Sequence, residues 1–551
     1  VLFRSRIRAA MEKRMSAFIC NERMAIPMKK RILCAVMASG MMAVSMASCG
    51  GSSSDSSANT SASENGSSET GSSEGGESAV DMDGDAYTVH FMMLNQTEGA
   101  SYDAVASAVN NLALSEINMN VDIIPVTFGT FASTTQMMLA SNEPLDLFCS
   151  TSPASLPTYI DAGYILNWAD YIDQLPDVQA YLGDEMQYGY IGDFMAGIGV
   201  IKERANTFGL VARTDILDEL GYTVDDFADV DAHNPSSLDK LDELFAAVQA
   251  KYPNMTVIAG QQGFASYVGN FTDALLDGYG VLANDGQDTT VTNWYESDQF
   301  RELAHVAKRW TDAHYYSSDA ATSQDTGETL LKAGNMFSYM VGIKPNTAAE
   351  KVAQCGYDVS VIPLNGVGNY TTSSYSSMMY CLANASENPE KAAAFYNWAF
   401  ASQEFEDLIN WGIEGTDWVE DANGQATYPD GVDSSSVGYH NDFGWIYPNQ
   451  TAGHAWTGNP VDIWDQYKEA ANEAVKSVAA GFTYDSTAVT DQVAACSAAS
   501  DQYLKTIAFG AASDIDATID EFNKALYDGG LQMIMDEKQS QLDAWMAEHA
   551  N

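Results

Sequence analysis

The sequence predicts an α/β protein with two alternating units and a helical C-terminal region. Apolar, β-branched runs alternate with amphipathic helical patterns between residues 87 and 162. A second alternating run starts near residue 208, and the last hundred residues, from Ile463 to His549, have mainly helical patterning. Strand–helix–strand alternation is typical of a parallel sheet that is covered by helices. We therefore expect two such sheets, each with its own core.

The first unit contains three expected strands, and polar residues follow two of them. The expected strands cover 87–94, 120–126 and 146–149, with helices near 102–116, 131–140 and 153–162. Ligands of open α/β sheets bind beyond the carboxyl ends of the strands. Asn95, which follows the first strand, and Thr151 and Ser152, which follow the third, are therefore candidate ligand-binding residues.

The second unit contributes two more candidates. Its expected strands cover 208–213, 256–259, 336–340 and 359–363, and a further strand at 380–383 leads into a helix over 391–400. Tyr339 lies near the end of one strand and is a candidate ligand contact. Arg213 is a candidate because the chain has few cations. It is available to an acidic ligand group, whereas a salt bridge with Asp215 is the alternative interpretation.

The N-terminal region reads as an export signal. Residues 1–27 have no fold-like pattern and are expected to be an upstream extension. Residues 28–48 begin with Met28-Lys29-Lys30-Arg31 and continue as an apolar run. This is the pattern of a secretory signal, and the run is too short and too interrupted for a membrane helix. Its end, Met46-Ala47-Ser48-Cys49-Gly50, resembles a bacterial lipobox, which implies a lipid on Cys49 and a place on the outer face of the membrane. A plain signal with an incidental cysteine is the alternative.

Residues 49–80 are expected to form a tether between that lipid and the folded body. The segment consists mainly of Ser and Gly with some acidic residues, and it has too few apolar side chains to form a core. Such a chain behaves as a flexible coil. The lipid is the only contact with the membrane that we expect.

The charge of the chain excludes several classes of partner. The 551 residues include 26 Lys and Arg and 75 Asp and Glu, a formal net charge of −49. Nucleic-acid binding and adhesion to anionic lipid need a cationic surface, so neither is expected. The acidity favours a soluble monomer and makes a strongly anionic solute the least suitable ligand. A hydrophobic fraction of 46% excludes a disordered acidic protein.

Motifs for catalysis and for metals are missing from the sequence. It contains no GxSxG elbow, no HExxH pair and no phosphate-binding loop, and its seven histidines are scattered. The four cysteines after Cys49 form no CxxC pair and are expected to be mostly free and buried, with two disulfides as the alternative: Cys149, Cys355, Cys381 and Cys496. We expect no metal, no cofactor and no catalytic residues. Paired carboxylates of a glycosidase cannot be recognised among so many acids.

Taken in order, several segments resemble the extracellular solute-binding lipoproteins of bacterial ABC importers. The resemblance is to carbohydrate-binding family 1, and to a subgroup of larger proteins with a C-terminal domain of unknown function. It spans nearly all of residues 86–548, and it follows a lipobox and a tether. The segments that carry it are 209–217, 334–337, 357–364, 385–392, 411–418 and 539–545.

The resemblance implies a two-lobed fold of the periplasmic-binding-protein type, with a hinge and an interlobe cleft. It places residues 86–207 and 378–425 in lobe 1, and residues 208–377 and 426–551 in lobe 2. The implied function is capture of a small polar solute, most simply an oligosaccharide, for delivery to an ABC permease without catalysis. A peptide remains an alternative solute. A secreted glycoside hydrolase or another carbohydrate-active lipoprotein is the alternative function.

Aromatic and acidic residues near position 440 are the remaining candidates for sugar contacts. Sugars need flat aromatic faces for their C–H patches and planar polar groups for their hydroxyls. Trp445 and Trp456 lie in a stretch rich in Gly, Asn and aromatic residues, and Glu414 and Asp417 lie between two tryptophans. The alternatives are that these tryptophans pack at the junction of the lobes and that the acids belong to a solvated turn.

Overall fold

The computed structural model describes residues 84–549 except 206, 261 and 324. The predictions made for residues 1–80, including the signal and the lipid on Cys49, lie outside this range. No helix in the part of the chain that the structure describes is both long enough and apolar enough to cross a bilayer.

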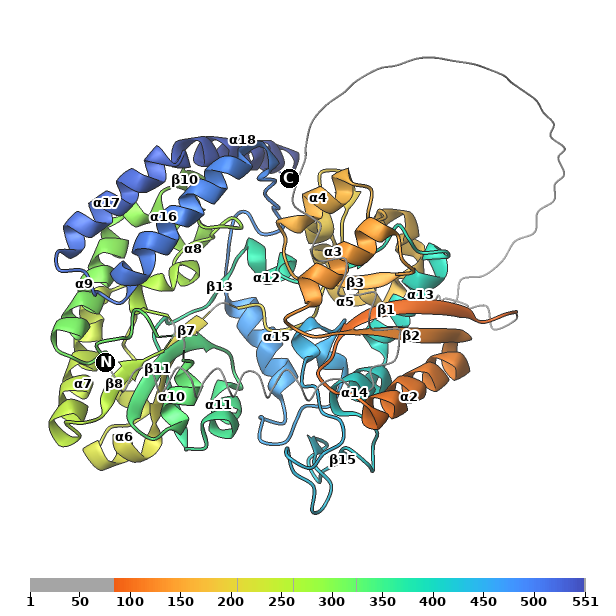
Figure 1. Cartoon of the computed structure of the whole chain (residues 1–551), viewed down its shortest axis with the longest axis horizontal. Coiled ribbons are helices and arrows are strands. Elements are labelled where there is room, and N and C mark those ends of the chain that lie inside the picture. Colours follow the sequence, from red (N-terminus) through yellow and green to blue (C-terminus); the bar gives the residue numbers. More distant parts are fainter. Residues whose placement is uncertain (1–83, 206, 261, 324, 550–551) are drawn as a thin grey trace, which may run out of the picture. The chain divides into compact units, whose positions relative to one another are not determined.

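Lobe 1 is built on a five-stranded sheet with the order β2-β1-β3-β14-β6. All three strands predicted for its first part are present within one or two residues. Its strands are β1 Tyr87–Leu94, β2 Met119–Val126, β3 Leu147–Ser150, β6 Ile198–Gly199 and β14 Met379–Leu382. Its main helices are α2 Ala100–Ile117, α3 Phe131–Ser141, α4 Ser155–Asp161, α5 Pro176–Leu182, α13 Pro389–Ala401 and α14 Gln403–Trp411 (Figure 1).

Lobe 2 is built on a four-stranded sheet with the order β12-β7-β11-β8. The strands are β7 Thr207–Arg213, β8 Thr256–Ala259, β11 Met336–Ile343 and β12 Val359–Pro363. The helices that accompany them are α6 Thr214–Leu220, α7 Asp239–Lys251, α9 Asp298–Asp312, α10 Gly327–Lys332 and α11 Thr347–Cys355. α9 is strongly amphipathic and buries Phe300, Leu303 and Trp310.

Both sheets are mixed, which corrects the expectation of parallel sheets. β1 pairs in parallel with β2 and β3, whereas β14 runs antiparallel to β3. In lobe 2, β7 runs antiparallel to both of its neighbours, β11 and β12. The reason is that β7 and β14 enter their sheets from the other lobe. In lobe 2, the end of β11 therefore lies beside the start of β7, and Ile343 pairs with Thr207.

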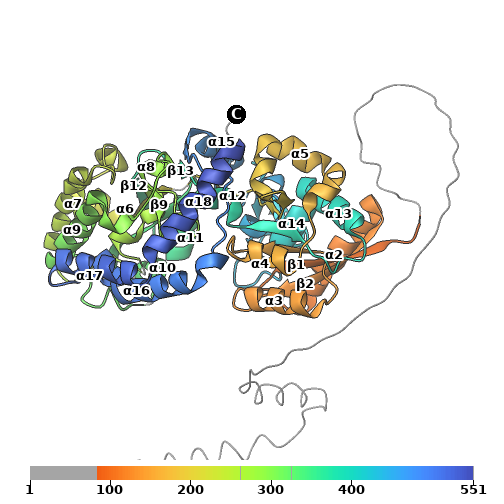
Figure 2. The ribbon, with the colours of Figure 1, turned by 90° about the horizontal axis from the view of Figure 1, so that it is seen from above.

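The C-terminal helices complete the core of lobe 2. They are α16 Thr490–Ala508, α17 Ile515–Asp528 and α18 Leu531–His549, and they confirm the predicted helical end of the chain. Cys496, Phe522 and Leu542 belong to the same buried cluster as Phe208 and Trp310. Both views show these blue helices beside the green elements of lobe 2 (Figures 1 and 2). The C-terminal region is therefore part of lobe 2.

Three segments of the chain cross between the lobes. Ile201 is the last residue of the lobe 1 core before Phe208 opens the lobe 2 core. The second crossing lies between Leu364 and Tyr375. The third begins only after Tyr447, which packs in the lobe 1 core. Residues 426–447 therefore belong to lobe 1, which corrects the boundary expected at residue 425.

The crossing segments contact one another in one region. β13 (Asn369–Tyr370) pairs with β17 (Val475–Lys476), and Ile201 forms a bridge with Asn449. The buried Arg204 guanidinium donates hydrogen bonds to Glu185 Oε2 at 2.7 Å and to the Tyr370 hydroxyl at 3.0 Å. These contacts join all three crossings, so they form the hinge region of the molecule.

Candidate functional site

A loop of lobe 1, residues 439–447, is fixed at the carboxyl end of β1. The buried Asn441 side chain lies within hydrogen-bond distance of Asn95 Oδ1 (3.0 Å) and the Tyr439 hydroxyl (2.7 Å). The Tyr447 hydroxyl donates to the carbonyl oxygen of Leu94, the last residue of β1, at 2.8 Å. Buried and satisfied polar networks of this kind are rigid. The loop therefore holds the residues between its anchors in defined positions.

Three aromatic side chains form a shelf beside this loop. We define the aromatic shelf as Phe128, Phe443 and Trp445. Phe128 and Trp445 have ring centroids 5.6 Å apart, and Phe443 and Trp445 have centroids 6.1 Å apart. Phe128 follows β2 and remains 60% exposed. Large exposed aromatic rings at the end of a sheet are available to stack on a ligand.

Asp442 lies in the loop 439–447, between Asn441 and Tyr447, whose contacts fix that loop. Its φ angle of 55° is unusual for a residue other than glycine, and its side chain is exposed. Its carboxylate has no hydrogen-bond or ion-pair partner among the described residues. Burial still raises the pKa of Asp442 to about 6, while Lys344 of lobe 2 lowers it. Asp442 is thus an accessible carboxylate within the electrostatic reach of the other lobe.

Lys344 follows the end of β11 and is surrounded by acids. Its Nζ lies 3.3 Å from Glu350 Oε2. Burial opposes its charge, but Glu203, Tyr467 and Glu350 together raise the pKa of Lys344 above its usual value. The ammonium group is therefore charged and already paired within lobe 2.

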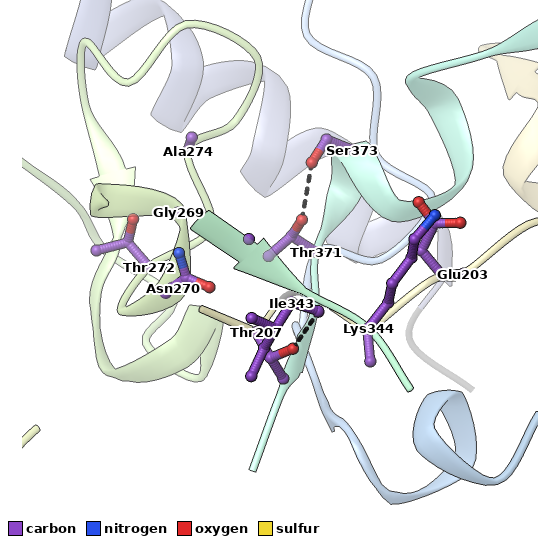
Figure 3. A pocket seen from close by; sticks show the side chains of 12 residues that line it. Glu203, Thr207, Gly269, Asn270, Thr272, Ala274, Ile343, Lys344, Thr371 and Ser373 are labelled. Atoms are coloured by element: carbon purple, nitrogen blue, oxygen red, sulfur yellow. Dashed lines mark hydrogen bonds between the residues drawn. The ribbon is translucent and has the colours of Figure 1, made fainter. Parts of the chain in front are cut away.

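A cavity of about 350 Å³ lies between Lys344 and the crossing segments (Figure 3). Its lining includes five residues with polar side chains that can contact a ligand: Glu203, Thr207, Asn270, Lys344 and Ser373. Glu203 Oε2 and Asn270 Oδ1 are buried and have no hydrogen-bond partner in the described structure. Such acceptors are costly to bury without donors. The cavity is therefore equipped to receive hydroxyl or amide donors.

Of the residues predicted after strands, Asn95 has a supporting role. It is buried, donates to the carbonyl oxygen of Thr97 at 2.6 Å and accepts from Asn441. Thr151 is exposed and lines a small cavity of about 130 Å³ together with Ser373, which also lines the larger cavity. Ser152 is half-buried and its carbonyl oxygen accepts from Ser150. Thr151 thus lies beside the polar cavity. Asn95 instead supports the loop 439–447 through its contact with Asn441.

Three other predicted residues occupy structural positions. Tyr339 is 2% exposed and its hydroxyl faces Cys355 Sγ at 3.6 Å, so it is a core residue and not a ligand contact. Asp417 accepts hydrogen bonds from the backbone N–H groups of Ile413 and Tyr439, which occupy its carboxylate. Arg213 forms the alternative salt bridge, with Asp215, at the edge of the sheet opposite Lys344.

The three remaining predicted residues lie in three different places in lobe 1. Trp445 belongs to the aromatic shelf. Trp456 packs against Trp411, with ring centroids 4.9 Å apart, and against His440 and Tyr428. Glu414 is exposed and lines a separate recess of lobe 1 with Trp418 and His454.

Three residues of the site were missed by the sequence reasoning: Phe128, Lys344 and Glu203. Asp442 lies in the aromatic stretch that the sequence indicated around Trp445. Phe128 follows an expected strand, so the rule that selected Asn95 would have found it as well. Lys344 is a cation in a chain with few of them, which was the signal used for Arg213. Glu203 gives no signal in the sequence because its position depends on where the chain crosses between the lobes.

No cluster of three or more His, Cys, Asp or Glu that is able to hold a metal occurs within residues 84–549 as described. The four cysteines of this part of the chain are free and buried, as predicted.

Comparison with known families identifies the chain. The family described as bacterial extracellular solute-binding protein matches residues 95–404, more than half of the sequence. The chain belongs to this family. A second family, described as a domain of unknown function (DUF3502), matches residues 478–547. The predicted family, including its C-terminal domain, is thus confirmed.

The chain is also similar to a curated transport protein. The carbohydrate ABC transporter substrate-binding protein of Streptococcus pneumoniae serotype 4 is 23% identical over 328 residues. The match covers 58% of this chain and 64% of the relative, so the chain spans less than two thirds of that protein's length.

Solved structures confirm the two-lobed α/β fold. The N-glycan transport solute-binding protein NgtS of Streptococcus pneumoniae superposes with a TM-score of 0.72 at 18% identity, covering 84% of this chain and 99% of that chain. The substrate-binding protein FusA of S. pneumoniae, in complex with kestose, gives a TM-score of 0.57 at 14% identity, covering 84% and 100%. At these identities the likeness shows the fold alone.

Proposed function

We propose that this extracellular solute-binding protein captures an oligosaccharide between its lobes and delivers it to an ABC permease. The observation that carries the proposal is the aromatic shelf beside Asp442, a carboxylate within the electrostatic reach of Lys344 at the polar cavity of lobe 2. Aromatic faces suit the C–H patches of sugars, and carboxylate and amide oxygens suit their hydroxyls. The names of the carbohydrate transporter protein and of NgtS and FusA support the same class of solute.

Binding in this arrangement is coupled to movement of the lobes. A ligand that contacts both Asp442 and the cavity of lobe 2 favours the closed arrangement, because only that arrangement lets it use both sets of contacts. The crossing segments, which a hydrogen bond between Arg204 and Tyr370 joins, act as the hinge of this movement. The permease is then proposed to recognise the closed form.

We further propose that the protein is a monomer, that Cys49 carries the lipid anchor, and that residues 49–80 are the tether. The proposed ligand contacts from the sequence are Trp445 and Thr151, to which the structure adds Phe128, Asp442, Lys344 and Glu203. Trp456 and Glu414 are not included, since the first packs within lobe 1 and the second lines a separate recess.

The test is a binding screen of the purified protein. Melting temperature is measured against neutral oligosaccharides, peptides and amino acids, and binders are confirmed by calorimetry. A ligand at 100 times its Kd adds about 2.7 kcal/mol to the free energy of unfolding. Chromatography of the ligand after incubation separates binding from hydrolysis. Stabilisation by peptides alone, or cleavage of the oligosaccharide, would overturn the proposal.

A further inference from the structure

The charged groups around the proposed ligand site include three carboxylates. Glu203 lines the cavity, Glu350 pairs with Lys344, and Asp442 faces them from lobe 1. Besides Lys344, two lysines lie next to this set: Lys351, whose Nζ is 3.0 Å from Glu350 Oε1, and Lys202, whose Nζ is 3.8 Å from Glu203 Oε1. Each of these three ammonium groups therefore already has a carboxylate partner.

The free hydrogen-bonding capacity of the site is in its acceptors. Glu203 Oε2 and Asn270 Oδ1 are buried without donors, and the Asp442 carboxylate is accessible without a partner. A hydroxyl group brings a donor to each of these oxygens. A ligand carboxylate brings only acceptors and a negative charge, and a like charge at short range in a partly desolvated site is strongly unfavourable.

We infer that the cleft selects neutral oligosaccharides and that Glu203 and Asp442 reject those carrying carboxylates. This inference rests on the proposed function, because it concerns which oligosaccharides that site accepts. The ligand's hydroxyls donate to Glu203, Asn270 and Asp442, while Lys344 remains paired with Glu350. A uronic acid in the same place meets two carboxylates and finds no unpaired ammonium group.

The pKa of Asp442 supports this assignment. Burial raises it to about 6, with Lys344 lowering it and Glu350 raising it. Asp442 is therefore ionised at pH 7.5 and accepts hydrogen bonds there. At pH 5 it is mainly protonated, and the rejection of acidic ligands becomes weaker.

The experiment compares matched pairs of ligands. Each neutral oligosaccharide that binds in the screen is oxidised at its primary hydroxyls to the corresponding uronate, so that the two ligands differ only in the carboxylates. Calorimetry of the full protein at pH 7.5 is expected to give a Kd for the uronate at least 30-fold higher than for the neutral sugar. The double variant Glu203→Gln/Asp442→Asn is expected to reduce this ratio to below fivefold.

A second double variant controls for overall charge. Glu404→Gln/Asp528→Asn removes the same two charges from exposed positions on α14 and α17, and is expected to leave the ratio unchanged. A uronate that binds as tightly as its neutral parent overturns the inference and leaves oligosaccharide binding intact. A control variant that lowers the ratio as much as the cleft variant overturns the roles of Glu203 and Asp442. Absence of binding by every oligosaccharide overturns the proposed function, and the inference with it.

Discussion

Replacing Phe128 by alanine tests whether the aromatic shelf binds the ligand. The ring is 60% exposed, so most of its surface is free to be covered by a sugar. One face of an aromatic ring and the C–H patch that covers it bury about 80 Å² together. At roughly 25 cal/mol per Å² this amounts to about 2 kcal/mol, or about a 30-fold increase in Kd.

The same substitution is expected to have little effect on folding, because less than half of the ring is buried. We expect the free energy of unfolding to fall by no more than about 1 kcal/mol, measured by urea denaturation. Met137→Ala is the matched control, since Met137 is 59% exposed on α3 and lies outside the shelf. Calorimetry with an oligosaccharide found in the screen gives both affinities. If Phe128→Ala and Met137→Ala bind the ligand equally well, the shelf is not a ligand platform.

Three further substitutions test the support of the loop at Asn441, a charged histidine of lobe 2 and the hinge region. Asn441→Ala leaves several buried partners unsatisfied, so we expect a loss of about 2–3 kcal/mol in urea unfolding together with weaker ligand binding. His233→Asn removes a side chain whose pKa is raised to about 9 by hydrogen bonds with Asp285 and Asp231. The stabilisation by His233 is full below pH 6.5 and is lost as the pH rises through 9, so the stability difference from the wild type, on the order of 1 kcal/mol after solvent screening, should disappear across that window. Arg204→Met removes the ion pair with Glu185 and the hydrogen bond to Tyr370 that links two crossing segments, and is expected to cost about 3 kcal/mol in the same assay.

Each of these has an outcome that contradicts it. Asn423→Ala, at an exposed turn, controls for the loss of an amide; equal effects of the two asparagine variants would mean that the Asn441 network is not rigid. A stability difference at His233 that grows above pH 8 would reverse the assigned charge state. An Arg204 variant as stable as the wild type would show that the pair only compensates its own desolvation.

The secondary structure was predictable because short stretches of the sequence determine it. The run Tyr87–Leu94 was predicted residue for residue, since it is apolar and ends at a polar turn. Strand direction was not predictable in the same way. β14 looks like any buried strand, and its antiparallel pairing with β3 depends on its arrival from the other lobe. The boundary at residue 425 was wrong for a similar reason, because Tyr439 and Tyr447 pack in lobe 1 through contacts distant in sequence.

The site was only partly predictable. The rule that ligands bind beyond strand ends led to Asn95, which lies at the right edge but has its side chain turned to Asn441. The rule does not distinguish a residue that contacts a ligand from one that positions a neighbouring residue, as Asn95 positions Asn441. The prediction that Tyr339 contacts a ligand is not supported, because its position in a strand does not determine which face of the sheet is buried. In the structure the ring packs beside Cys355. Trp445, which stays a proposed ligand contact, was selected because it lies in a loop with many aromatic residues.

The last helix of the chain has a consequence for the order of folding. Leu542 packs in the same core as Phe208, so lobe 2 lacks part of its interior until the final residues of the protein have been made. Lobe 1 contains its whole core by Tyr447. Synthesis from the N-terminus therefore allows lobe 1 to fold first, while the unfinished second half exposes apolar surface that attracts chaperones. A truncation that removes α18 is expected to leave a chain with one folded lobe, prone to aggregate through the other.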